Sequence, residues 1–313
     1  MNDVRILGPG ATSLTVSSPG TFRVFSFGPG TKNFLSGLTI SNAGGIANAG
    51  ALTIVDCTLI GNTGAGGMGG AIYNGSNLTL VNSLVASNRV QGIGPFAQGS
   101  QGTAGAGGGV YSDVGKLSIN KCTFVGNTAR GGDGGSYELG HFGLPGTDGM
   151  GGAICIAGGS ATISNSTFAA NVATGGNAGY ASGYGTCGGR GMGGALTVSN
   201  AEVAIVNSTI SGNQAVGGAG STGAFSGCGG QYGLGGAVHC HTGQIYFVNC
   251  TLTQNDAIGG PRPPLWLNPG SGLGGAAYNY LGSVEEICNP NFDKPVRLES
   301  NSRAHEFFWA HVF

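Results

Sequence analysis

The sequence predicts an all-β fold, a parallel β-helix with three short strands in each turn. A cassette that opens with a Gly pair and closes with Asn recurs at 69–88, 107–127, 151–171, 193–213 and 235–255. The closing Asn follows the first Gly by 19 positions in the first cassette and by 20 in the other four, and such a constant repeat is typical of a solenoid. Within each cassette, apolar residues alternate with polar ones in three short runs, as strands require. We expect a right-handed helix, because parallel crossovers are overwhelmingly right-handed.

Apolar residues at equivalent positions should stack on one another in successive turns, about 4.8 Å apart. Before the closing Asn we expect the column Leu59, Leu84, Phe124, Phe168, Ile210 and Leu252. After Gly-Gly-Ala we expect the column Ile72, Val110, Ile154, Leu196, Val238 and Ala277.

Two polar columns support the same fold. One, at the corner between the second and third strands, is Asp56, Asn82, Lys121, Asn165, Asn207 and Asn249. The other closes the third strand and is Asn62, Asn88, Asn127, Asn171, Asn213 and Asn255. Asn tolerates a left-handed backbone, and stacked amides can hydrogen bond to one another, so both columns are predicted to be structural.

The segments between cassettes vary in length and are rich in glycine. From each closing Asn to the next Gly pair there are 7, 19, 24, 22, 22 and 19 residues. Because surface loops accept insertions at little cost, we expect these inserts to leave the helix at one corner. The entropy of ordering glycine favours disorder, whereas the equal lengths of two successive inserts favour stacking into an extra layer. Both outcomes stay open.

We divide the chain into irregular N-terminal turns (1–43), regular repeats (44–280) and a C-terminal segment (281–313) in which the repeat stops. A solenoid end must be capped, so this tail is expected to be a cap with a short helix near 302–312. The alternative is a terminus at which a longer protein was interrupted.

The repeats resemble those of the chlamydial polymorphic membrane proteins and of other exported bacterial right-handed β-helix proteins. The motifs that carry this resemblance are GGAI (69–72 and 151–154), GGAL (193–196), GGAV (235–238), FVGN (124–127) and FAAN (168–171). GGGV at 107–110 departs from the pattern, as do copies with Leu or Ile in place of Phe. The resemblance covers roughly residues 4 to 280. It implies autotransporter-like export to the outer membrane or secretion, with adhesion as the function, and it brings no catalytic residues.

Composition limits the other function classes. The net charge is −1 with only 25 charged residues, so nucleic acid is not an expected partner. The chain has neither a signal-peptide pattern nor an 18-residue apolar span, and we therefore expect no membrane span. Together with the resemblance, this favours a piece of a larger exported protein over a cytosolic one, with a host-surface protein or a glycan as partner.

Eight cysteines raise the question of disulfides. Cys57, Cys122 and Cys250 share a column with serines and should be buried free thiols, because they do not lie on adjacent turns. Cys187 and Cys228 occupy similar places in neighbouring inserts, where a disulfide is feasible.

The rival hypothesis is a polysaccharide-active lyase or hydrolase, which needs carboxylates converging from neighbouring turns. The one acidic cluster is Asp133, Glu138 and Asp148, near His141 in a single insert. GGDGGSYEL and GTDGMGG faintly resemble calcium-binding nonapeptides, but neither recurs with a nine-residue period. We expect no cofactor, with calcium as the alternative, and favour a solvated loop over a catalytic centre.

A second candidate surface is an outward column made of Tyr73, Tyr111, Cys155, Thr197, His239 and Tyr278. Exposed aromatic rings could stack on sugars, and His239 with His241 could bind a metal, but aromatic residues are also ordinary strand formers. A column of Thr58, Thr123, Thr167, Thr209 and Thr251, interrupted by Leu84, keeps ice binding as a minor alternative. The favoured function is a non-enzymatic adhesion or interaction module.

Overall fold

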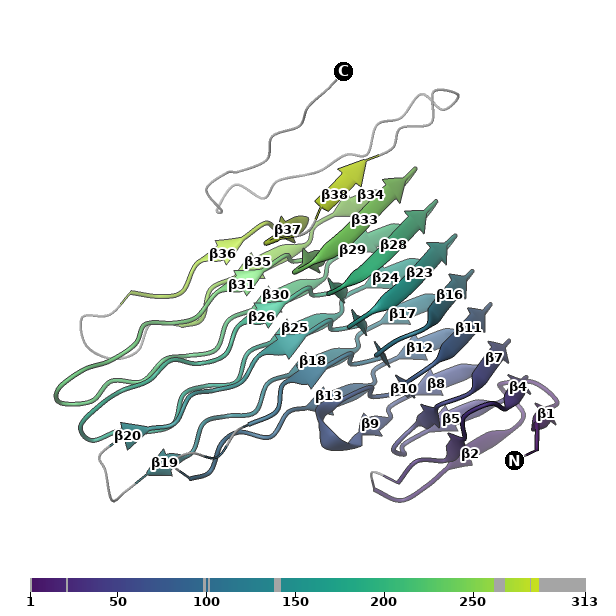
Figure 1. Cartoon of the computed structure of the whole chain (residues 1–313), viewed down its shortest axis with the longest axis horizontal. Helices are drawn as coiled ribbons and strands as arrows, with labels where there is room; N and C mark the ends of the chain where they lie inside the picture. The colour runs from purple at the N-terminus through teal and green to yellow at the C-terminus, as the bar shows by residue number, and fades with distance from the viewer. Residues whose placement is uncertain are drawn as a thin grey trace.

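The computed structural model describes residues 2–20, 22–97, 100, 102–137, 142–261, 268–281 and 283–286. It is a parallel β-helix with three long sheets, here called A, B and C, that run the length of the body (Figure 1). Sheet A contains nine strands: β1 (Arg5–Leu7), β4 (Lys32–Ser36), β7 (Ala51–Val55), β11 (Asn77–Val81), β16 (Lys116–Asn120), β23 (Gly159–Ser164), β28 (Ala201–Val206), β33 (Gly243–Val248) and β38 (Ser283–Glu286).

Sheets B and C contain eight strands each. Sheet B is β2 (Thr15–Ser17), β5 (Thr39–Ser41), β8 (Thr58–Ile60), β12 (Leu84–Ala86), β17 (Thr123–Val125), β24 (Thr167–Ala169), β29 (Thr209–Ser211) and β34 (Thr251–Thr253). Sheet C is β3 (Phe25–Phe27), β6 (Ile46–Asn48), β10 (Ile72–Asn74), β15 (Val110–Ser112), β22 (Ile154–Ile156), β27 (Leu196–Val198), β32 (Val238–Cys240) and β37 (Ala277–Asn279). Each turn visits sheets C, A and B in that order, so the prediction of three strands per turn is confirmed.

The core lies inside the three sheets and is filled by the alternate side chains that the sequence pattern selects. Leu78 pairs with Leu117 and Leu80 with Ile119, and all four are buried. Phe124 and Phe168 stack with ring centroids 4.8 Å apart. One expected member of this column is wrong. Val85, and not Leu84, pairs with Phe124, because Val85 and Phe124 each stand three residues before a closing Asn, whereas Leu84 pairs with Thr123 on the outward side.

The two asparagine columns have different roles. In the closing column, Asn127 Nδ2 donates to Asn171 Oδ1 (2.9 Å) and to the Val85 carbonyl (2.9 Å), and every member is buried. The same bonds join Asn62 to Asn88, Asn88 to Asn127, Asn171 to Asn213 and Asn213 to Asn255. In the corner column all six residues have φ between 47° and 55°, and several are exposed. The closing column is therefore an amide ladder, whereas the corner column is defined by its left-handed backbone.

The described parts of the inserts stack into a layer that extends from one corner of the body, to the left in Figure 1. We call this layer the wing; it comprises residues 63–68, 89–97, 100, 102–106, 128–137, 142–150, 172–192, 214–234, 256–261 and 268–273. Outgoing strands form one sheet: β9 (Thr63–Gly64), β13 (Arg89–Gln91), β18 (Thr128–Arg130), β25 (Val172–Thr174), β30 (Gln214–Val216) and β35 (Asp256–Ile258). Returning strands form another: β14 (Gly105–Ala106), β21 (Gly149–Met150), β26 (Gly191–Met192), β31 (Gly233–Leu234) and β36 (Gly272–Leu273). Of the two outcomes left open, the structure has the stacked layer.

Glycine makes the wing thin. A Cβ atom added at Gly191 would overlap the backbone of Val216 on the outgoing strand of the next turn, and one added at Gly149 would overlap that of Thr174. The two sheets of the wing therefore pack backbone against backbone. The wing also contains a short 3-10 helix, η1 (Ala65–Gly67), and an antiparallel pair, β19 (Ser136–Tyr137) and β20 (Phe142–Gly143).

The ends of the chain continue the same sheets. Strands β1 and β2 extend sheets A and B ahead of the turn formed by β3, β4 and β5, and no wing segment precedes β6; these strands lie within the region predicted to be irregular. At the other end β38 pairs with β33, so sheet A extends into the predicted C-terminal tail. The rest of that tail, with the expected helix near 302–312, lies outside the described residues. No helix in the described part of the chain is long and apolar enough to cross a membrane.

Candidate functional site

The predicted outward column of sheet C exists, but most of it is not exposed. Tyr73, Tyr111, Cys155, Thr197, His239 and Tyr278 are paired in register from β10 to β37. However, Tyr111, Cys155, Thr197 and His239 are all buried. The expectation that this column forms an open contact face is therefore wrong for these four residues.

The wing is the physical reason for this burial. Its returning strands lie over sheet C, and Ala106, Tyr111 and Cys155 form a small second core there, against which Met68 and Met150 pack. Tyr73 and Tyr111 stack on each other with centroids 5.6 Å apart. Burial, with smaller contributions from Cys155 and Asp113, raises the pKa of the Tyr111 hydroxyl. This part of the column attaches the wing to the body.

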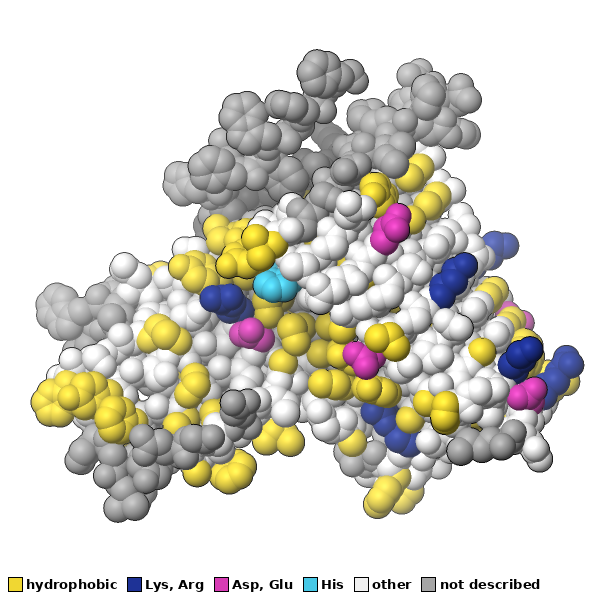
Figure 2. Space-filling model, viewed as in Figure 1, with side chains coloured by type: hydrophobic (Ala, Val, Ile, Leu, Met, Phe, Trp, Pro, Cys, Tyr) yellow, Lys and Arg dark blue, Asp and Glu magenta, His cyan; other side chains and the backbone are white. Residues whose placement is uncertain are grey.

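Near the C-terminal end of the same column, the wing and sheet C leave a pocket of about 280 Å³. Its polar lining comes from Asp148 and Arg190 on the wing side, and from His239, His241 and Tyr280 next to sheet C. The ring centroids of His241 and Tyr280 are 5.2 Å apart, and those of His239 and Tyr278 are 5.7 Å apart. Figure 2 shows imidazole, basic and acidic side chains close together on the face where the wing meets the body.

The pocket does not match a metal site built from acidic, imidazole and thiol ligands. Within the part of the chain that the structure describes, no three His, Cys, Asp or Glu side chains are grouped as metal ligands. Burial, with smaller contributions from the charges of His241 and Arg190, lowers the pKa of His239 to about 4. A cation placed beside this imidazole would be repelled by Arg190.

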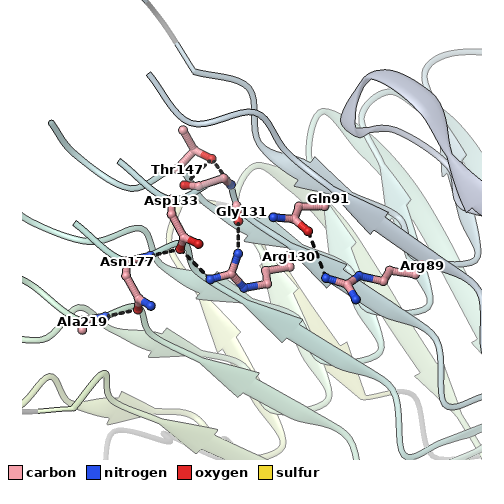
Figure 3. A network of polar contacts seen from close by, with 9 residues as sticks. Arg89, Gln91, Arg130, Gly131, Asp133, Thr147, Asn177 and Ala219 are labelled. Atoms are coloured by element: carbon pink, nitrogen blue, oxygen red, sulfur yellow. Dashed lines mark hydrogen bonds and ion pairs between the residues drawn. The ribbon is translucent and has the colours of Figure 1, made fainter. Parts of the chain in front are cut away.

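The candidate catalytic carboxylates take part in stacking the wing. Asp133 accepts hydrogen bonds from the Arg130 guanidinium (2.5 Å) and from the Asn177 backbone amide of the next turn (2.7 Å). Figure 3 shows that Asn177 then accepts from the Ala219 amide, one turn further on (2.9 Å). Burial acts to raise the pKa of Asp133, but the bonds from Arg130 and Asn177 outweigh it and hold the pKa below its ordinary value.

Asp148 has a similar role, because its Oδ1 accepts from the Arg190 backbone amide at 2.6 Å. Glu138 and His141, the remaining members of the acidic cluster, lie outside the described residues. The two described carboxylates are thus each bonded to an amide of the following turn.

The threonine column of sheet B is in register and begins earlier than predicted. It runs through Thr15, Thr39, Thr58, Leu84, Thr123, Thr167, Thr209 and Thr251. Leu84 pairs with Thr58 on one side and Thr123 on the other, so it interrupts the array as predicted.

A row of exposed aromatic rings lies at the free end of the wing, and the sequence analysis did not identify it. The rings of Phe142 and Tyr184 stack with centroids 4.9 Å apart, and those of Tyr184 and Phe225 are tilted by 45° with centroids 5.3 Å apart. Their exposed fractions are 42%, 44% and 73%. Figure 2 shows hydrophobic side chains gathered at this end, near β20. We call these three residues the aromatic ridge.

A disulfide joins two of the wing turns that carry the ridge. Cys187 and Cys228 are bonded, with Cα atoms 5.0 Å apart, so the feasible pairing is confirmed. Each cysteine follows a ridge residue by three positions, Tyr184 and Phe225 respectively. The predicted free thiols Cys57, Cys122 and Cys250 are buried, and burial raises the pKa of Cys122 to about 11.

The sequence contained a signal for both the ridge and the pocket. Phe142 and Tyr184 are 42 residues apart, as are Asp148 and Arg190. The closing asparagines of the later turns are also 42 residues apart. Aligning the inserts at that period would have placed each of these pairs on neighbouring turns.

No protein-family model, curated protein or solved structure matches this chain. The class of protein is therefore defined by the fold alone, a parallel β-helix whose inserts form a stacked glycine-rich layer.

Proposed function

We propose that the chain is a non-catalytic interaction module of an exported bacterial protein, which adheres to a protein partner through the aromatic ridge. The observation that carries this proposal is the contact between the rings of Phe142, Tyr184 and Phe225 on successive turns while all three remain exposed. Clustered exposed apolar side chains mark interaction sites on soluble proteins. Aromatic residues are also enriched among those that contribute most of the energy of an interface.

The geometry of the ridge favours a protein over a glycan. Phe142 and Tyr184 are nearly parallel, with 15° between their planes, and Phe225 lies against Tyr184 at 45°, so the central ring of the ridge has a neighbouring ring on each side. A sugar stacks on an open aromatic face, whereas an apolar groove in a protein accommodates ring edges. The surrounding segments 172–189 and 215–232 contain no charged residue, so recognition would depend on apolar contact.

The disulfide supports a location outside the cytosol. Disulfides form and persist in oxidising compartments and are rare in cytosolic proteins. Cys187–Cys228 fixes two adjacent wing turns to each other, three residues from two of the ridge residues. Display outside the cell agrees with the export that the repeat motifs imply.

The test is adhesion of beads coated with the chain to cultured epithelial cells. Substituting Phe142, Tyr184 and Phe225 together by Ser should lower the number of bound beads at least tenfold. Phe22→Ser is the matched control, because Phe22 is 74% exposed but precedes β3, several turns before those that carry the ridge. Protease treatment of the cells should abolish adhesion. Undiminished adhesion of the triple variant, or its loss after glycosidase treatment alone, would refute the proposal.

A separate assay tests the rival enzymatic hypothesis. The chain is incubated with acidic and neutral polysaccharides, with calcium and then with a chelator, and new chain ends are measured. We expect none. Chelator-sensitive cleavage that is lost in Asp148→Asn would overturn the non-catalytic assignment.

A further inference from the structure

The pocket between the wing and sheet C contains an unpaired polar atom. His239 is 1% exposed, and its Nδ1 is the one buried side-chain nitrogen or oxygen without a hydrogen-bond partner among the described residues. An unpaired buried polar atom is destabilising, so native proteins seldom keep one without a role. The atom therefore points to a ligand that completes its hydrogen bonding.

The charged side chains around His239 determine which ligand charge this pocket favours. Arg190 lines the same pocket, and its guanidinium makes no hydrogen bond or ion pair within the described residues, since Asp148 accepts only from its backbone amide. Because the charges of Arg190 and His241 act on His239 in the same direction, the imidazole lies in a positive local field. An anionic group would be stabilised there.

The rest of the lining indicates that the ligand is more than a simple anion. Asp148 contributes a carboxylate, which would repel a bare anion but accept hydrogen bonds from hydroxyl groups. Met150, Met192 and Leu234, on the returning strands β21, β26 and β31, form an apolar wall. A volume of about 280 Å³ lies just below the range for drug-sized ligands, which suits a ligand of about one sugar ring.

We infer that this pocket binds a small hydroxylated carboxylate of the sugar-acid class. Its carboxylate would face Arg190 and the His239 imidazole, its hydroxyl groups would face Asp148, and its ring would lie against the apolar wall. The inference concerns a site separate from the aromatic ridge and does not depend on the proposed function.

Isothermal titration calorimetry of the full chain with glucuronate tests the inference. Glucuronate should bind and glucose should not, because only glucuronate carries the anionic group. Arg190→Gln should weaken glucuronate binding at least tenfold. Arg89→Gln is the matched control, because Arg89 is an exposed wing arginine that pairs with Gln91 and does not line the pocket. Both variants should keep the thermal unfolding midpoint of the parent chain.

A spectroscopic measurement locates the ligand independently of affinity. Glucuronate should shift the imidazole nitrogen signals of His239, and those signals are identified by their loss in His239→Phe. The inference is overturned if glucuronate fails to bind at millimolar concentration, if Arg190→Gln binds it as tightly as the parent chain does, or if sulfate binds as tightly as glucuronate. The last outcome would indicate a simple anion site.

Discussion

The body and the wing are both stacks of parallel strands, yet they are held together differently. In the body, large side chains such as Phe124 and Leu52 fill the interior, and the buried amide ladder closes each turn. In the wing, glycine brings backbone against backbone, as where Gly176 packs on the Gly132 carbonyl of the preceding turn. The body depends on which side chains are present, whereas the wing depends on their absence.

Because of this difference, the body and the wing are expected to be sensitive to different kinds of substitution. A core position responds to lost volume or a lost hydrogen bond. A wing position responds to added volume, because a single methyl group has no space. The following predictions test whether the body and the wing can be destabilised independently of each other.

The largest effect is expected in the ladder of the body. In Asn127→Asp a carboxylate replaces the amide that donates to Asn171 Oδ1 and to the Val85 carbonyl, so two acceptors face a buried negative charge. We expect a loss of about 4 kcal/mol in the free energy of unfolding, measured by urea denaturation followed by circular dichroism.

The same substitution in the corner column is the control. Asn165 is exposed, with φ 51°, and Asp56 already occupies the equivalent position with φ 54°. Asn165→Asp should therefore change the free energy of unfolding by less than about 0.5 kcal/mol. Equal effects at residues 127 and 165 would contradict the distinction between ladder and corner.

The next largest effect is expected from acid, at the junction of the two layers. The pKa of His239 is about 4 in the folded chain, against 6.5 for a free imidazole, so the unfolded chain binds more protons between these values. Stability from this group is complete above pH 6.5 and is lost as the pH falls towards 4, by about 3 kcal/mol at most. The other titratable groups lining the pocket are Asp148, Arg190, His241 and Tyr280.

His239→Phe isolates this contribution, because a phenyl ring can keep the stack on Tyr278 but cannot be protonated. Urea unfolding midpoints at pH 7.5 and pH 4.5 should differ less for the variant than for the parent chain. If both lose the same stability, the imidazole is not the source of the acid sensitivity.

The smallest effect is expected in the wing. A Cβ atom in Gly176→Ala would overlap backbone atoms of Gly132, at a local cost of about 1–3 kcal/mol. Hydrogen exchange should show faster exchange of wing amides such as that of Gly176, which donates to the Thr147 carbonyl, while ladder amides stay protected. Gly75→Ala is the control, because its Cβ would make only ordinary contacts. Global loss of protection would mean that the wing and the body unfold together.

The same contrast explains what the sequence could predict. Alternating Leu and Ile and the repeated closing Asn identified the three body sheets, because core side chains have a period and a chemistry that can be read along the chain. Whether the wing is ordered could not be predicted, because a glycine-rich sequence is equally compatible with a packed layer and with a flexible loop. The burial of Tyr111 and His239 was not predicted for the same reason, because the sequence did not show that the inserts stack over sheet C.

The later turns of the body and of the wing share one repeat length. Asn171, Asn213 and Asn255 are spaced by 42 residues, and so are Gly149, Gly191 and Gly233 on the returning strands of the wing. Body and wing thus advance by one common translation. Excising residues 172–213 would join Asn171 to Gln214, the residue that now follows Asn213, and would present each remaining strand with a neighbour of the same type. Apart from the Cys187–Cys228 disulfide and the contacts of Tyr184, which the excision would remove, the pairing between turns would keep its type, so the molecule could be shortened or lengthened by whole turns.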